Sequence, residues 1–237
     1  QAGYGANEPW FEGITINCRV LAVISRWGME IGWDPVDDDS LMGYTMESAQ
    51  QLGVNLMAYA TAQRAWAKQA AHAMQFVDKE SGTTAGKMFI AQVMYPGEWK
   101  TRHAGISVLL QQFNTKTEIP VKYERRELKL SDPKIFDAPL LYITGHEDFR
   151  LSPAEISGLH EYLNKGGLLF AEACCGRRAF DLALREALSK ALPGQTLKPI
   201  AQGNLIFNMP NKVTQLAITP ALGASLGGRA TVEPNLL

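Results

Sequence analysis

An apolar stretch typical of a buried strand runs directly into a helical pattern near the middle of the second half of this sequence. Residues 168–173, Leu-Leu-Phe-Ala-Glu-Ala, follow Gly166-Gly167 and lead into Cys174-Cys175-Gly176. A helical pattern begins at once, over residues 177–192. A strand that enters a helix through so tight a turn presents one side chain at the carboxyl edge of a sheet, as a nucleophile elbow does. The stretch therefore predicts an α/β fold with a candidate site at this turn.

The second part of the chain alternates strand and helix patterns. Strands are predicted over residues 88–94, 121–128, 139–144, 168–173 and 197–200, and helices over residues 103–113, 153–164 and 177–192. Ser152-Pro153-Ala154-Glu155 has the form of a capping box with proline at the first helical position. This alternation predicts βαβ units and a parallel sheet.

The first part of the chain is predicted to be an N-terminal portion packed on that sheet. We expect one strand over residues 14–24, a long loop over 25–44 and a helical region over 45–77, which Gly53 would split in two. The polar stretch 78–87 predicts a linker, so the expected division is 1–85 and 86–237. The start at Gln1 and the end at Leu237 favour a piece of a longer protein, with a truncated second domain and other domains of the parent chain as partners.

Composition excludes several classes of function. The formal net charge of -1 argues against nucleic-acid binding and against adhesion to anionic membranes. No apolar run approaches the roughly 20 residues that span a bilayer, so no membrane insertion is expected. Three cysteines, two of them adjacent, predict no disulfide framework and fit a reducing compartment.

Three loops are expected to meet at the carboxyl edge of the sheet, where ligands bind in open α/β folds. They follow the strands at 88–94, 139–144 and 168–173. We predict a small-molecule site there. Its candidate ligand-binding residues are Arg102, His103, Gly145, Cys175, Gly176, Arg177 and Arg178.

The candidate catalytic residues are Cys174, His146 and Glu172. A helix N-terminus with Arg177 and Arg178 nearby would favour a thiolate at Cys174, and His146 would act as its base. The alternative is a small, buried and inert cysteine that fits a tight turn.

The other polar groups also have two interpretations. His146 is either a structural histidine or a metal ligand with a thiolate, Glu147, Asp148 or Glu172, but the spacing is not His-Glu-x-x-His, and we predict no metal site and no cofactor. Arg177 and Arg178 either hold a phosphate or carboxylate, or are solvated or paired with Asp181 and Glu172. Asp37-Asp38-Asp39 is expected to be an exposed acidic turn.

Residues 86–237 resemble a bacterial family known as domain of unknown function 4159. The resemblance is carried by residues 95–99, 136–146, 151–155, 166–169 and 174–176, with Phe180-Asp181. It implies a flavodoxin-like αβα sandwich similar to class I glutamine amidotransferases, with sugar-handling relatives, in a bacterial protein of the cytoplasm or the envelope. In those enzymes the elbow is Gly-x-Cys-x-Gly with a later His/Glu pair. Here Cys174 takes the nucleophile position, Glu172 replaces the first glycine, and no histidine follows His160.

Two functions stay open at this point. The first is a non-catalytic domain that binds a small anionic or sugar-like ligand at the carboxyl edge. The second is a thiol-dependent hydrolase or transferase with Cys174 as nucleophile, His146 as base, and backbone N–H groups near Cys175 and Gly176 as oxyanion donors.

Overall fold

The computed structural model describes residues 10–16, 19–34, 40–74, 89–101, 105–117, 119 and 125–234, except for the side chains of residues 63–74. The predicted linker at 78–87, the acidic run at 37–39, and Arg102 and His103 lie outside these residues. The division into an N-terminal and a C-terminal part therefore stays a prediction.

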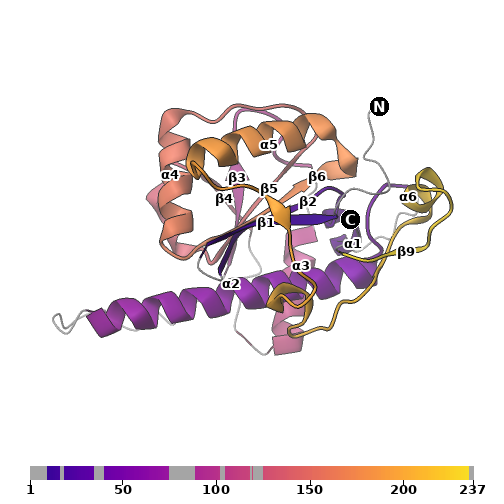
Figure 1. Ribbon diagram of the computed structural model, residues 1–237, viewed down its shortest axis with the longest axis horizontal. Helices are drawn as coiled ribbons and strands as arrows, with labels where there is room; N and C mark the ends of the chain where they lie inside the picture. Colours follow the sequence, from indigo (N-terminus) through magenta and orange to yellow (C-terminus); the bar gives the residue numbers. More distant parts are fainter. Residues whose placement is uncertain are drawn as a thin grey trace.

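One seven-stranded sheet forms the centre of the fold (Figure 1), with the order β4-β3-β5-β6-β2-β1-β7. Its strands are β1 (Phe11–Ile16), β2 (Arg19–Ser25), β3 (Ile90–Met94), β4 (Arg126–Lys129), β5 (Leu140–Gly145), β6 (Leu168–Ala173) and β7 (Lys198–Pro199). The five strands from β4 to β2 are mutually parallel, β1 runs antiparallel to β2, and β7, at the edge, runs antiparallel to β1. The predicted α/β fold with a mostly parallel sheet is confirmed.

Helices cover both faces of this sheet (Figure 1). The helices α1 (Glu30–Trp33), α2 (Met46–Met74) and α3 (Gly105–Thr117) share one apolar core with the sheet. The helices α4 (Pro153–Asn164) and α5 (Arg178–Ala191) share the other. Because side chains alternate along a strand, Phe170 belongs to the first core and its neighbour Leu169 to the second. Both central strands, β5 and β6, are fully buried for this reason.

Shorter elements complete the chain. They are the 3₁₀ turns η1 (Pro133–Asp137), η2 (Cys174–Gly176) and η3 (Leu205–Phe207), the strands β8 (Leu216–Ala217) and β9 (Thr231–Val232), and the helix α6 (Pro220–Ser225). In the part of the chain that the structure describes, no helix combines the length and the hydrophobicity of a membrane span.

The N-terminal strand prediction was wrong in one respect. Residues 14–24 do not form one strand: β1 and β2 pair antiparallel, with Ile16 opposite Arg19. The alternation of apolar and polar residues has the same period in one long strand and in two paired strands, so the pattern could not separate them. β2 also pairs in parallel with β6, which places it inside the sheet.

Two further predictions in this region need correction. The expected loop at 25–44 contains α1, whose residues are all buried. Gly53 does not interrupt α2, which is continuous. A Cβ at Gly53 would lie 2.6 Å from Leu109 of α3 and 2.9 Å from the Trp33 indole, so this glycine permits close packing of three helices.

The helix before the central strand begins as predicted. The Ser152 side chain accepts a hydrogen bond from the backbone N–H of Glu155, and the Glu155 carboxylate accepts one from the Ser152 backbone, which completes the capping box of α4. The helix therefore has a fixed start, and the chain returns from it to β6.

Candidate functional site

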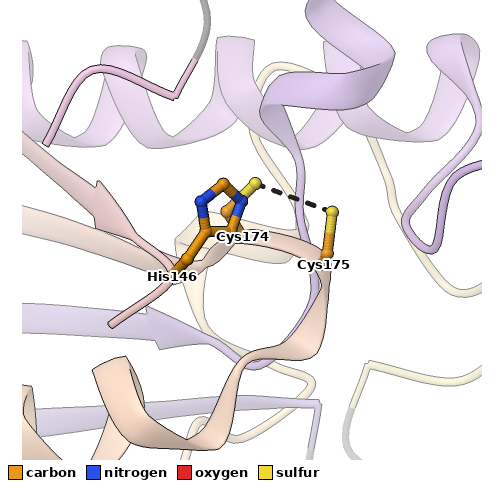
Figure 2. A group of neighbouring side chains, drawn as sticks. All are labelled: His146, Cys174 and Cys175. Carbon is orange, nitrogen blue, oxygen red and sulfur yellow. Dashed lines mark hydrogen bonds between the residues drawn. The ribbon is translucent and has the colours of Figure 1, made fainter. Parts of the chain in front are cut away.

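The loops after β3, β5 and β6 meet at the carboxyl edge of the sheet. Glu98 comes from the first loop, His146 from the second, and Cys174 and Cys175 from the third. The Nδ1 atom of His146 lies 3.0 Å from Oε2 of Glu98. The ligand atoms of His146, Cys174 and Cys175 all lie within 4.8 Å of one another (Figure 2).

The turn after β6 has the backbone of a nucleophile elbow. β6 ends at Ala173, η2 takes three residues, and α5 begins at Arg178. Cys175 has φ 55° and ψ 26°, the single positive φ of a residue other than glycine in the described chain. Such a conformation costs on the order of 1 kcal/mol or more and is concentrated at functional sites. Gly176 follows with φ 67°, and a Cβ there would lie 2.3 Å from the Trp27 ring.

The two cysteines of this turn have different surroundings. Their sulfurs lie 3.8 Å apart (Figure 2). Cys174 is buried, whereas Cys175 is partly exposed. A hydrogen bond with Cys175 raises the pKa of the Cys174 thiol, and burial raises it further, so Cys174 stays a thiol at neutral pH. This environment opposes the thiolate that we expected at Cys174.

His146 is held between Glu98 and Cys175. A side-chain hydrogen bond with Cys175 raises the pKa of His146, burial opposes this effect, and Glu98 raises the pKa further. The Tyr95 hydroxyl lies 2.9 Å from the Thr144 carbonyl and 3.0 Å from that of Glu98, so it joins the β3 loop to the end of β5. The buried Tyr95 side chain therefore holds the backbone of Glu98 close to the end of β5, where His146 follows.

Two buried carboxyl groups lie beside this cluster, on the α1 side of the sheet. Glu172 accepts hydrogen bonds from the backbone N–H groups of Met29 (2.6 Å) and Glu30 (3.2 Å). The Tyr142 hydroxyl lies 2.8 Å from Glu172 and 3.2 Å from the carboxylate of Glu30, which also accepts a hydrogen bond from Thr101. Glu172 and Glu30 are at most 1% exposed.

The surroundings of Glu172 favour its protonated form at neutral pH. Burial raises the pKa of Glu172 to about 8, and the charge of Glu30 adds to this effect. Burial raises the pKa of Tyr142 as well, with the two glutamates contributing, so its hydroxyl remains a donor. The hydrogen bonds that Glu172 accepts from the backbone of Met29 and Glu30 connect β6 to the segment between β2 and α1.

Sequence reasoning missed Glu30, Tyr142 and Glu98 as site residues. Glu98 lies in a segment that carried the family resemblance, at the end of a predicted strand, and this position was the available signal. Glu30 lay in the expected loop and Tyr142 in an apolar strand, so neither had a local signal.

The remaining predicted residues are placed as follows. Gly145 lies at the end of β5, and a Cβ there would come within 2.0 Å of the Tyr95 hydroxyl. Arg177 and Arg178 are exposed at the start of α5. Asp181 pairs with Arg185 at 3.0 Å. Arg102 and His103 lie outside the described residues.

Two surface cavities lie away from this edge. One, of about 550 Å³, is bordered by α2, α3 and Asn211, and the other, of about 520 Å³, lies between α4 and α5. Neither is lined by His146, Cys174 or Cys175. The residue geometry at the carboxyl edge is therefore the stronger indication of function.

Comparison with known proteins gives a family and no activity. None of the curated proteins matches the chain significantly. A family model described as a domain of unknown function, DUF4159, matches residues 89–234, which include β3 to β9 and every residue of the Glu98, His146 and Cys174–Cys175 cluster. The chain therefore belongs to the DUF4159 family.

Proposed function

We propose that this chain is a thiol-dependent hydrolase or transferase with Cys175 as nucleophile, His146 as base and Glu98 as the group that orients His146. The observation that carries the proposal is the positive φ of Cys175 in the turn between β6 and α5, beside His146. A nucleophile, a base and a third group in hydrogen-bond contact are the arrangement used for covalent catalysis.

The strand order supports an amidotransferase-like fold for this enzyme. From β3 to β6 the chain places its strands in the order β4-β3-β5-β6, and β2 takes the fifth position. This order corresponds to the flavodoxin-like 2-1-3-4-5 arrangement, with the final position filled from the N-terminal side of the chain. The point where the strand order reverses lies between β3 and β5, and Glu98 and His146 meet just beyond it.

The reaction would proceed by acyl transfer. His146 accepts the proton of the Cys175 thiol as the sulfur attacks the substrate carbonyl and a carbon–sulfur bond forms. His146 then returns that proton to the leaving group, and the bond between the carbonyl and the leaving group breaks. Water, or a second acceptor, attacks the resulting thioester and releases Cys175. Backbone N–H groups at Cys175 and Gly176 would stabilise the oxyanion.

Cys175 replaces Cys174 in the role of nucleophile for a geometric reason. Cys174 is 4% exposed and its thiol is stabilised in the neutral form, whereas Cys175 is partly exposed and contacts the base. The partners His146 and Glu98 precede the nucleophile along the chain, whereas in amidotransferases they follow it. Chain order differs among convergent catalytic sites, so this departure does not oppose the proposal.

Alkylation kinetics test this proposal. We expect iodoacetamide to label Cys175 at least about tenfold faster than Cys174, because reactivity follows accessibility and thiolate character. His146→Ala should slow labelling and move the midpoint of the rate against pH upward. The measurement is peptide mass spectrometry over pH 5–10, with His160→Ala on α4 as the matched histidine control.

The outcome also separates the two functions. If Cys175 stays unreactive until the protein unfolds, the turn is structural and the chain is a non-catalytic domain that binds a small ligand. If Cys174 is labelled first, the nucleophile assignment is wrong, although thiol chemistry at this edge would remain.

A further inference from the structure

We propose that His146, Cys174 and Cys175 form a binding site for a soft divalent cation, with Zn²⁺ as the cation that fits best. The three ligand atoms lie within 4.8 Å of one another. One imidazole nitrogen and two sulfurs are the ligand types that favour Zn²⁺ over Mg²⁺ or Ca²⁺. This differs from the sequence analysis, which predicted no metal site.

The distances suit tetrahedral coordination. With Zn–S bonds of about 2.3 Å, two sulfurs on one tetrahedral zinc lie about 3.8 Å apart. The two cysteine sulfurs lie 3.8 Å apart. A nitrogen and a sulfur on the same ion would lie about 3.6 Å apart. The ligand atoms lie within 4.8 Å of one another, so each nitrogen–sulfur distance needs to shorten by about 1.2 Å at most.

The backbone at Cys175 explains how adjacent cysteines reach one ion. In an extended segment, neighbouring side chains point to opposite sides. The φ of 55° at Cys175 turns the chain, and both sulfurs come to the same side of η2 (Figure 2). Gly176, packed against the Trp27 ring, maintains the turn. Binding of a cation by both sulfurs would thus explain the strained backbone of Cys175 without any catalytic role.

Glu98 supplies the support that a metal-binding histidine requires. Its carboxylate lies 3.0 Å from Nδ1 of His146, which leaves Nε2 as the atom that binds the ion. A histidine ligand commonly donates its other N–H to such a carboxylate, which fixes the ring and increases its basicity. The Tyr95 hydroxyl joins the β3 loop, and hence Glu98, to β5.

Three protein ligands leave a fourth coordination position for water or a small ligand, as in catalytic rather than structural zinc sites. His146 and Cys175 are both partly exposed, so this position faces solvent. A bound cation would occupy the sulfur that the proposed thiol enzyme uses as nucleophile. The metal-bound and thiol-active forms are therefore alternative states, and only the inhibitory effect of the cation depends on the proposed function.

Cobalt titration of the reduced 237-residue chain tests the site, because Co²⁺ in tetrahedral sulfur coordination has intense visible bands. We expect one Co²⁺ per chain, displaced by Zn²⁺. Cys174→Ser, Cys175→Ser and His146→Ala should each abolish these bands, whereas Cys18→Ser and His160→Ala should retain them. Glu98→Gln should weaken the affinity by about 10- to 100-fold, as loss of a supporting carboxylate does. Thermal unfolding of every variant verifies that it is folded.

The metal-site proposal is wrong if the reduced wild type shows no sulfur-to-cobalt bands. It is also wrong if the bands persist in both Cys174→Ser and Cys175→Ser. The two proposals fail separately. If Cys175 is reactive but the chain binds no cobalt, the thiol-enzyme proposal stands and the metal-site proposal is wrong. If the chain binds cobalt but Cys175 is unreactive in the metal-free protein, the metal-site proposal stands and the thiol-enzyme proposal is wrong. If both hold, Zn²⁺ should block alkylation of Cys175 and a chelator should restore it, and in Cys174→Ser alkylation should continue in the presence of Zn²⁺.

Discussion

Cys175 shows how one backbone conformation determines the chemistry of two adjacent side chains. Its positive φ separates a partly exposed thiol that contacts His146 from the buried thiol of Cys174. Gly176 has a positive φ as well, but glycine adopts it without strain. A cysteine in this conformation therefore points to a function that needs the sulfur at this position.

Glu172 is predicted to make stability depend on pH. Its pKa is about 8 in the folded protein and near 4.5 when unfolded, so the folded state binds an extra proton between these values. The stability that this proton supplies is complete below pH 4.5 and is lost as pH rises towards 8, at no more than about 1.4 kcal/mol per pH unit.

Glu172→Gln should remove this contribution. The glutamine oxygen can accept the backbone N–H groups of Met29 and Glu30, and its amide can donate towards Tyr142. We expect a flatter curve of unfolding free energy between pH 5 and 8, measured by urea denaturation. Glu186→Gln, on the exposed face of α5, is the control and should retain the slope. An unchanged slope in Glu172→Gln would show that Glu172 is ionised in the folded protein.

At the scale of elements, the site depends on the close approach of β5 to the β3 loop. A Cβ at Gly145 would lie 2.0 Å from the Tyr95 hydroxyl and 2.8 Å from the Phe180 ring. Tyr95 and Phe180 pack in the same apolar core, together with Phe149. The end of β5 therefore accepts only glycine without moving the loop that carries Glu98.

Gly145→Ala should accordingly destabilise the protein by about 1–3 kcal/mol, as overpacking in a core does. It should also weaken cobalt binding, because Glu98 would move away from His146. Gly203→Ala is the matched control, since a Cβ there meets nothing within 4 Å, and its effect should stay within about 0.5 kcal/mol. Chemical denaturation measures the stability of both variants. Equal stability of the two variants would mean that the Tyr95 loop is not fixed by this contact.

At the scale of the whole molecule, the N-terminal residues complete the sheet and the site. β2 lies between β6 and β1, and the backbone of Met29 and Glu30 binds Glu172 on β6. The family match begins only at residue 89. The residues before the family match therefore supply the strand β2 and the backbone donors to Glu172, both of which contact β6 in the matched part.

A fragment of residues 86–237 is predicted not to fold cooperatively. Without β2 and α1, the fragment would expose an edge of β6 and leave Glu172 without its two N–H donors, which is costly for a buried carboxyl group. Circular dichroism during heating measures this, with the full chain as control. A cooperative transition in the fragment would instead support the two separable parts predicted from the sequence.

Local patterns determined much of this fold in advance. The alternation of strands and helices, the capping box at Ser152 and the tight turn after residues 168–173 each depend on neighbours a few residues apart, so periodicity and turn chemistry revealed them. The same patterns placed His146 and the two cysteines at ends of parallel strands. The meeting of these loops followed from the general geometry of parallel sheets.

Which distant groups meet depends on long-range pairing and packing. Glu30 and Glu172 are 142 residues apart in the chain, and their contact depends on β2 pairing with β6, which no local period encodes. The choice between Cys174 and Cys175 depends on a backbone angle that tertiary packing imposes against local preference, with Trp27 packed on the turn. Local patterns thus predicted the alternating strands and helices of the second part of the chain and the sheet edge where its loops meet. Long-range strand pairing and packing determined the site, because they bring together residues whose energies depend on one another only in the folded chain.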